Sequence, residues 1–139
     1  LRRYRDALYL GRAMPATPTA VLTWDWRLRP ELELPAGLGR LRLRPALAGE
    51  TTFAAPSQPL RVDWQRASLR LQLAAGAPHR TLRNLFQEHG VVPWMRASLP
   101  LLFSGDALAA VADLWIDVAY QGREAGGHVL EWLDHPAIF

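Results

Sequence analysis

The stretch Leu41-Arg42-Leu43-Arg44 alternates leucine with arginine, and Leu69-Arg70-Leu71-Gln72-Leu73 repeats the alternation with leucine and polar residues. Successive side chains of a β-strand point to opposite faces, so strict alternation is typical of a strand with one buried and one solvated face. Both stretches are therefore predicted to be strands with their leucines in the core. The same alternation predicts that the arginines at positions 42, 44 and 70 are exposed.

Further short runs of β-forming residues surround these two stretches and are separated by proline and glycine. They predict strands at 21–27, 31–34, 60–65, 99–103, 106–111, 114–118 and 129–133. Ser104-Gly105 lies between two of the runs and is typical of a hairpin. Residues 45–59 are rich in alanine, proline and threonine with almost no charge, so they are predicted to form a long loop.

One helix is predicted, over residues 81–89, with Gly90 ending it. One face of this helix follows the i, i+3, i+4, i+7 spacing and consists of Leu82, Leu85, Phe86 and His89, of which His89 is expected at the edge of the core. The same spacing recurs in a polar set on the opposite face: Arg80, Arg83, Asn84 and Gln87. The expected fold class is α+β, mainly β, with one amphipathic helix.

The length of 139 residues, half of them hydrophobic and six of them tryptophan, suffices for one core and a short lead-in. Residues 1–10 alternate loosely and predict a strand, and residues 11–19 hold two prolines among small residues and predict a linker. We therefore expect 1–19 to be the end of, or a linker from, a preceding domain, and 20–139 to be the main domain. The start at Leu1 without methionine leads us to expect an upstream part.

The basic residues are all arginine and are unevenly distributed. Residues 1–80 hold thirteen arginines and six acidic residues, a net charge of +7, whereas residues 81–139 hold three arginines and seven acidic residues, a net charge of −4. Arginine presents planar, bidentate donors that suit phosphate. The asymmetry is compatible with a polyanion-binding surface and equally with a solvated basic face that binds nothing.

Several classes of site are absent from the sequence. No cysteine is present, which excludes disulfides and thiolate metal sites and fits a reducing compartment such as the cytoplasm. The four histidines lack metal-ligand spacing, and no nucleophile or nucleotide-binding motif occurs. Asp113 and Asp117 share a face of a predicted strand and are interpreted as solvent-facing edge residues without chemistry. They also interrupt the longest apolar stretch, so neither a membrane span nor a signal peptide is expected.

Two stretches in the second half of the chain contain several motifs in a fixed order. They are residues 80–103, RTLRNLFQEHGVVPWMRASLPLLF, and residues 106–117, DALAAVADLWID. These two stretches resemble the carboxy-terminal domain of bacterial tRNA(Ile)-lysidine synthetase, TilS. The resemblance lies in the order of five sequence elements: L-[KR]-x-L-F-Q-E, P-W-x-R, P-L-L, L-x-A-V and L-W-I. Upstream, RRYRDALY at 2–9 resembles the family's link from the middle domain, and LELPAG at 32–37 its first hairpin. Nearly the whole chain is covered.

Two positions depart from the family pattern. Many relatives have Gly-Gly-Glu where this chain has Arg66-Ala67-Ser68, and a glycine where it has Asp113. Aspartate tolerates the left-handed backbone that a glycine can supply, so the change at Asp113 is not expected to disturb the fold. The departure that changes expected contacts is then the one near Ser68.

The resemblance implies an enzyme that uses ATP and magnesium to adenylate the wobble cytidine of the isoleucine tRNA with a CAU anticodon, after which lysine displaces AMP to give lysidine. The family's catalytic Ser-Gly-Gly-x-Asp-Ser loop lies in an amino-terminal domain and does not occur in this sequence. The resemblance also implies a sandwich- or barrel-like sheet similar to a domain of the phenylalanyl-tRNA synthetase β chain. We therefore expect a cytoplasmic tRNA-holding module that has no catalytic, cofactor or metal residues and is inactive alone.

The residues expected to contact RNA carry donors that suit phosphate and 2′-hydroxyl oxygens without sequence readout. They are Arg80, Arg83, Asn84 and Gln87 on the predicted helix face, supported by Arg66, Arg70 and Arg96. A solvated surface remains the alternative for each of them. The expected partners are tRNA and the preceding domains of the same chain, with a homodimer possible.

Two other functions remain open from the sequence. One is a β-rich protein-interaction or dimerisation module in which arginine serves ion pairs, and the salt dependence of tRNA binding would separate it from an RNA-binding domain. The other is a small stand-alone enzyme, which is the weakest because no acid–base or nucleophile constellation is present.

Overall fold

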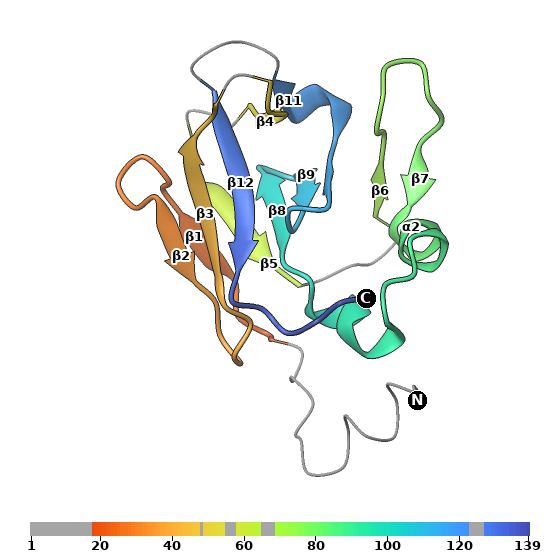
Figure 1. Ribbon diagram of the computed structural model, residues 1–139, viewed down its shortest axis with the longest axis horizontal. Helices are drawn as coiled ribbons and strands as arrows, with labels where there is room; N and C mark the ends of the chain where they lie inside the picture. The colour runs from red at the N-terminus through yellow and green to blue at the C-terminus, as the bar shows by residue number, and fades with distance from the viewer. Residues whose placement is uncertain (1–17, 48, 55–57, 65–68, 123–126) are drawn as a thin grey trace.

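The computed structural model describes residues 18–47, 49–54, 58–64, 69–122 and 127–139. These residues form two five-stranded antiparallel sheets, a two-stranded hairpin and one α-helix (Figure 1). The predicted fold, mainly β with one amphipathic helix, is confirmed. The strand predicted over residues 1–10 and most of the linker predicted over 11–19 lie outside the described residues.

The first sheet has the strand order β1-β5-β8-β9-β10. Its strands are β1 (Leu22–Trp24), β5 (Leu60–Asp63), β8 (Leu101–Ser104), β9 (Ala107–Val111) and β10 (Trp115–Ile116). The hairpin predicted at Ser104-Gly105 joins β8 to β9, and Gly105 adopts the positive φ of 61° that such a tight turn requires.

The second sheet has the strand order β11-β4-β12-β3-β2. Its strands are β2 (Glu31–Glu33), β3 (Arg40–Pro45), β4 (Thr52–Phe53), β11 (Gln121–Gly122) and β12 (His128–Leu133). The longest pairing joins β12 to β3, from His128 opposite Pro45 to Leu133 opposite Arg40. The last strand of the chain therefore lies at the centre of this sheet.

Buried side chains from both sheets form one hydrophobic cluster, as expected of a sandwich. Three of the five leucines predicted to be buried in the alternating stretches are buried: Leu41 is 0% exposed, Leu43 3% and Leu71 0%. Leu69 and Leu73 are only partly buried and pack against the core. The buried indole N–H groups are satisfied by backbone carbonyls, and Trp132 Nε1 donates to Leu38 O at 2.7 Å. Trp24 and Trp64 likewise donate their indole N–H to backbone carbonyls, whereas the hydroxyl oxygen of the buried Ser98 has no hydrogen-bond partner among the described residues.

Residues 45–59 do not form one long loop, because they contain β4. Thr52 and Phe53 are buried and pair with β11 and β12. A two-residue strand has no periodicity for sequence reasoning to detect, and its partners lie about seventy residues away along the chain. The loop prediction was wrong at this point.

The expected exposure of Arg42 and Arg44 was also wrong, although Arg70 is exposed as predicted. Arg42 Nη2 lies 2.5 Å from Glu131 Oε1, and Arg44 contacts both Glu131 Oε2, at 3.1 Å, and Glu50 Oε2, at 2.5 Å. Glu131 on β12 lies directly opposite Arg42 in the strand register. The two arginines are half-buried because a cross-strand carboxylate holds them against the sheet.

This ion-pair network should make the fold sensitive to acid. The hydrogen bond from Arg44 lowers the pKa of Glu50 to about 2, and the hydrogen bond from Arg42 is the largest cause that lowers the pKa of Glu131. A carboxylate with a lowered folded-state pKa contributes stability that is present above its ordinary value of 4.5 and is lost as the pH falls toward the folded value. Urea denaturation should show the free energy of unfolding falling from about pH 5 to about pH 2.

The Glu50→Gln variant is the matched control for the acid prediction, because it cannot titrate at this position. Its free energy of unfolding should be lower than the parent's at neutral pH and should decline less steeply below about pH 4.5. Parallel pH profiles for the two proteins would contradict the assignment of Glu50.

Candidate nucleic-acid interface

The helix α2 (Leu82–Glu88) follows a hairpin formed by β6 (Arg70–Leu71) and β7 (Arg80–Thr81). Figure 1 shows the hairpin and α2 together at one side of the sandwich. Thr81 caps the helix, with its Oγ1 accepting from the Asn84 N–H at 3.2 Å, and His89 is the C-cap. The helix predicted over 81–89 is therefore confirmed, with caps at its two end residues.

Hydrogen bonds attach this hairpin to the sandwich. Asp117 Oδ1 accepts from the Gln72 N–H at 2.9 Å, and the Val118 N–H donates to Gln72 O at 2.7 Å. Gln121 Nε2 donates to Leu73 O at 2.8 Å. Asp117 was interpreted from sequence as a solvent-facing edge residue, and this was wrong: it is half-buried and holds the hairpin that leads into α2.

Asp113 is exposed, as expected, and its Oδ2 accepts from the Trp132 N–H at 3.1 Å. The residue with left-handed backbone in this turn is not Asp113 but the preceding Ala112, with φ of 47°. The turn between β9 and β10 thus has its unusual conformation at a fully buried alanine.

The predicted contact residues are only partly on one surface. Arg83, Asn84 and Gln87 are exposed on α2, and Arg70 is exposed on the neighbouring β6. Arg66 and Ser68 lie outside the described residues. Four of the seven proposed contact residues are therefore donors at or beside the exposed face of α2.

Arg80 does not lie on the helix face. It belongs to β7, before the N-cap, and its guanidinium forms an ion pair with Glu88 at the far end of α2. The hydrogen bond from Arg80 is the largest cause that lowers the pKa of Glu88. The seven-residue spacing from Arg80 to Gln87 would place them on one face only if the helix began at Arg80, and the extended backbone of Thr81 prevents this.

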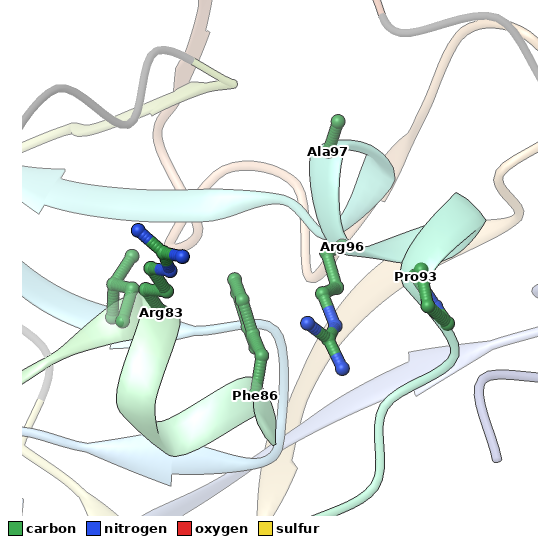
Figure 2. Close-up of a pocket in the computed structure, with 6 residues that line it drawn as sticks. Arg83, Phe86, Pro93, Arg96 and Ala97 are labelled. Carbon is green, nitrogen blue, oxygen red and sulfur yellow. The ribbon is translucent and has the colours of Figure 1, made fainter.

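Arg96 reaches the same region from another element. It lies in the 3₁₀ helix η1 (Pro93–Ser98), and its Nε–H donates to Val91 O at 2.9 Å. A groove of about 380 Å³ separates η1 from α2. Its lining residues are Leu82, Arg83, Phe86, Pro93, Arg96 and Ala97. Figure 2 shows Arg83 and Arg96 on either side of Phe86.

Sequence reasoning named Arg96 but missed the element that carries it. Pro93 occupies the first turn of η1, where its fixed φ and missing N–H are tolerated, and this was the available signal. Phe86 forms the floor of the groove and packs on Trp115 with 5.6 Å between ring centroids. His89 also packs on Trp115, at 5.3 Å, which fits its predicted place at the edge of the core.

The basic residues of the second sheet are already neutralised by the chain itself. Arg40 pairs with Glu31 at 3.2 Å and with Asp134, and Arg42 and Arg44 are paired as described above. In the described ranges, the guanidinium groups without a hydrogen bond or ion pair are those of Arg29, Arg70 and Arg83. Two of these three lie in the β6–β7–α2 unit.

Other kinds of site find no support in the part of the chain that the structure describes. Over these residues, no group of three or more histidine and acidic side chains could hold a metal ion. In the same ranges, every helix is too short or too polar to cross a membrane.

Comparison with known proteins gives a consistent result. The family described as TilS substrate C-terminal domain matches residues 60–132, just over half of the chain, from β5 to β12. The tRNA(Ile)-lysidine synthase of Alkalilimnicola ehrlichii is 38% identical over 114 residues, which is 82% of this chain and 25% of the relative. That of Shigella flexneri is 34% identical over 123 residues, 84% of this chain and 26% of the relative.

A third relative, the tRNA(Ile)-lysidine synthase of Xylella fastidiosa, is 39% identical over 115 residues, or 81% of this chain and 25% of the relative. The chain thus spans about a quarter of the length of the curated relatives that it matches. The matched part contains α2, η1 and the groove between them.

Proposed function

The chain belongs to the family of TilS substrate C-terminal domains, and from this premise we propose that it is the tRNA-holding domain of a tRNA(Ile)-lysidine synthase. The observation that carries the proposal is the set of outward-facing donors on β6 and α2. Arg70 and Arg83 are exposed and have no ion-pair or hydrogen-bond partner among the described residues, and the amides of Asn84 and Gln87 are exposed beside them.

These donor types suit the backbone of RNA. Guanidinium groups pair with phosphate oxygens, and side-chain amides donate to phosphate or to ribose 2′-hydroxyl oxygens. Such contacts fix the position of an RNA without reading its sequence. In this proposal the domain holds the isoleucine tRNA with the CAU anticodon in the cytoplasm, while a different domain uses ATP and magnesium to attach lysine to the wobble cytidine.

We expect the 139-residue chain to bind tRNA weakly and to lose affinity as salt rises. Each neutralised phosphate contributes about 0.9 to the slope of log affinity against log salt, so roughly three contacts give a slope of about −2.7. Raising the salt from about 50 to about 200 mM should then weaken binding roughly 40-fold. Fluorescence anisotropy with labelled tRNA measures this slope.

Two variants with the same charge change provide the control. Arg70→Gln removes an unpaired charge beside α2, whereas Arg29→Gln removes one between β1 and β2, on the opposite side of the molecule in Figure 1. Arg70→Gln should make the slope shallower by about 0.9, and Arg29→Gln should leave it unchanged. Equal effects would indicate a diffuse basic field, and binding that ignores salt would favour a protein-interaction or dimerisation module.

A further inference from the structure

The groove between α2 and η1 brings together two arginines that are distant in sequence. Arg83 extends from the helix and Arg96 from the 3₁₀ helix, and both line the same groove of about 380 Å³ (Figure 2). Between them lies Phe86, which is 1% exposed and closes the floor. The groove therefore has two cationic sides over an apolar base.

The two arginines are held differently. The Arg96 guanidinium is fixed through its Nε, which donates to Val91 O at 2.9 Å, and through the short helix that begins at Pro93. Arg83 is exposed and its guanidinium forms no hydrogen bond or ion pair with the described residues. One side of the groove is thus preorganised, and the other is free to close on a ligand.

The charge of the groove points to an anionic occupant. None of its six lining residues is acidic. Glu88, the acidic residue of α2, is engaged by Arg80. An anion between the two guanidinium groups would accept charge-assisted hydrogen bonds from both. The site has the chemistry of an anion clamp.

We propose that this groove binds one phosphodiester group of an RNA backbone, held by Arg83 on one side and Arg96 on the other. The proposal rests on the tRNA-binding function proposed above and assigns a single phosphate to a single place. The volume lies within the range of small-ligand pockets, about 300 to 1,000 Å³. The remaining walls, Leu82, Pro93 and Ala97, offer apolar contact to the adjoining ribose.

A double-mutant cycle tests whether the two arginines share one phosphate. The proteins are the parent 139-residue chain, Arg83→Gln, Arg96→Gln and the double variant, each titrated with tRNA at several salt concentrations. If one phosphate is shared, each single variant lowers affinity roughly tenfold, but its salt slope stays close to the parent's because the remaining arginine still contacts that phosphate. In the double variant the slope becomes shallower by about 0.9, because one phosphate is no longer neutralised.

Three results would overturn the clamp while leaving tRNA binding in place. A slope change of about 0.9 in each single variant and about 1.8 in the double variant would mean two separate phosphates, and an unchanged slope in the double variant would mean that the groove does not contact the backbone. Equally tight binding of a poly-glutamate peptide, with the same sensitivity to both substitutions, would mean that the groove takes protein carboxylates. A parent chain that fails to bind tRNA at any salt would overturn the clamp together with the proposed function.

The fold of each variant must be checked by a melting curve, because Arg96 also donates to Val91 O. Should Arg96→Gln unfold, Arg96→Lys replaces it in the cycle. Lysine keeps the charge but lacks the bidentate fork. Arg96→Lys should therefore keep the parent's salt slope and lose affinity, and unchanged affinity would count against a bidentate contact.

Discussion

Replacing Phe86 by alanine is expected to lower the free energy of unfolding by about 3 to 5 kcal/mol. Phe86 is 1% exposed and packs on Trp115 with 5.6 Å between ring centroids, so truncation leaves a cavity between α2 and the first sheet. Because α2 has only seven residues, its stability comes mainly from this packing rather than from helix propensity. Urea denaturation of the variant measures the loss.

The neighbouring residue provides the control for this prediction. Gln87 is exposed on the other face of the helix, and Gln87→Ala should change the free energy of unfolding by no more than about 0.5 kcal/mol. Phe86→Ala should weaken tRNA binding only as far as it unfolds the chain or displaces the floor of the groove. A loss below about 1 kcal/mol for Phe86→Ala would show that α2 is not anchored to the core.

The helix could be predicted because its signals are local and agree with one another. The apolar period, the capping threonine and the terminating glycine all lie within residues 81–90, and the structure places caps at Thr81 and His89. The long strands were predicted for the same reason, since Leu41 and Leu43 alternate with arginine over the whole of β3. The hydrophobic period and the residues that begin and end an element suffice to predict it where the element spans several residues.

Elements that depend on distant partners could not be predicted. The strand β4 has two residues and exists because it pairs with β11 and β12. The polar attachment of the β6–β7 hairpin likewise depends on Asp117 and Gln121, which lie more than forty residues from the backbone groups that they bind. A sequence pattern indicates which face of a strand or helix a residue lies on. It does not indicate which distant residues pack on that face.

The same limit explains which arginines were placed correctly. Composition suggested that the basic first half of the chain could present one polyanion-binding field. In the structure, Arg42 and Arg44 on β3 form ion pairs with Glu131 and Glu50. Among the described residues, Arg70 and Arg83 are the arginines near the proposed interface whose guanidinium groups have no such partner. Intramolecular pairing, rather than the number of arginines, therefore decides which surface is available to RNA.

Gly39 lies in the turn between β2 and β3. Among the described glycines with positive φ, it should be the one that least tolerates an added side chain. A Cβ at Gly39, where φ is +78°, would lie 1.9 Å from Leu133 O and 2.8 Å from the Asp134 carbonyl carbon. Both neighbours are backbone atoms at the end of β12, where Leu133 pairs with Arg40, so neither can move without disturbing the central strand pair of the second sheet. Gly39→Ala is therefore expected to lower the free energy of unfolding by roughly 4 kcal/mol or more.

Gly37 in the same turn separates the two causes of this expected loss. Its φ is +72°, but a Cβ there would meet nothing within 4 Å, so Gly37→Ala should cost only the left-handed strain of about 1 to 2 kcal/mol. Urea denaturation of the two variants side by side measures the difference. Equal losses would show that backbone conformation alone sets the cost at Gly39, whereas a much larger loss for Gly39→Ala would show that the close approach of β12 requires glycine at that position.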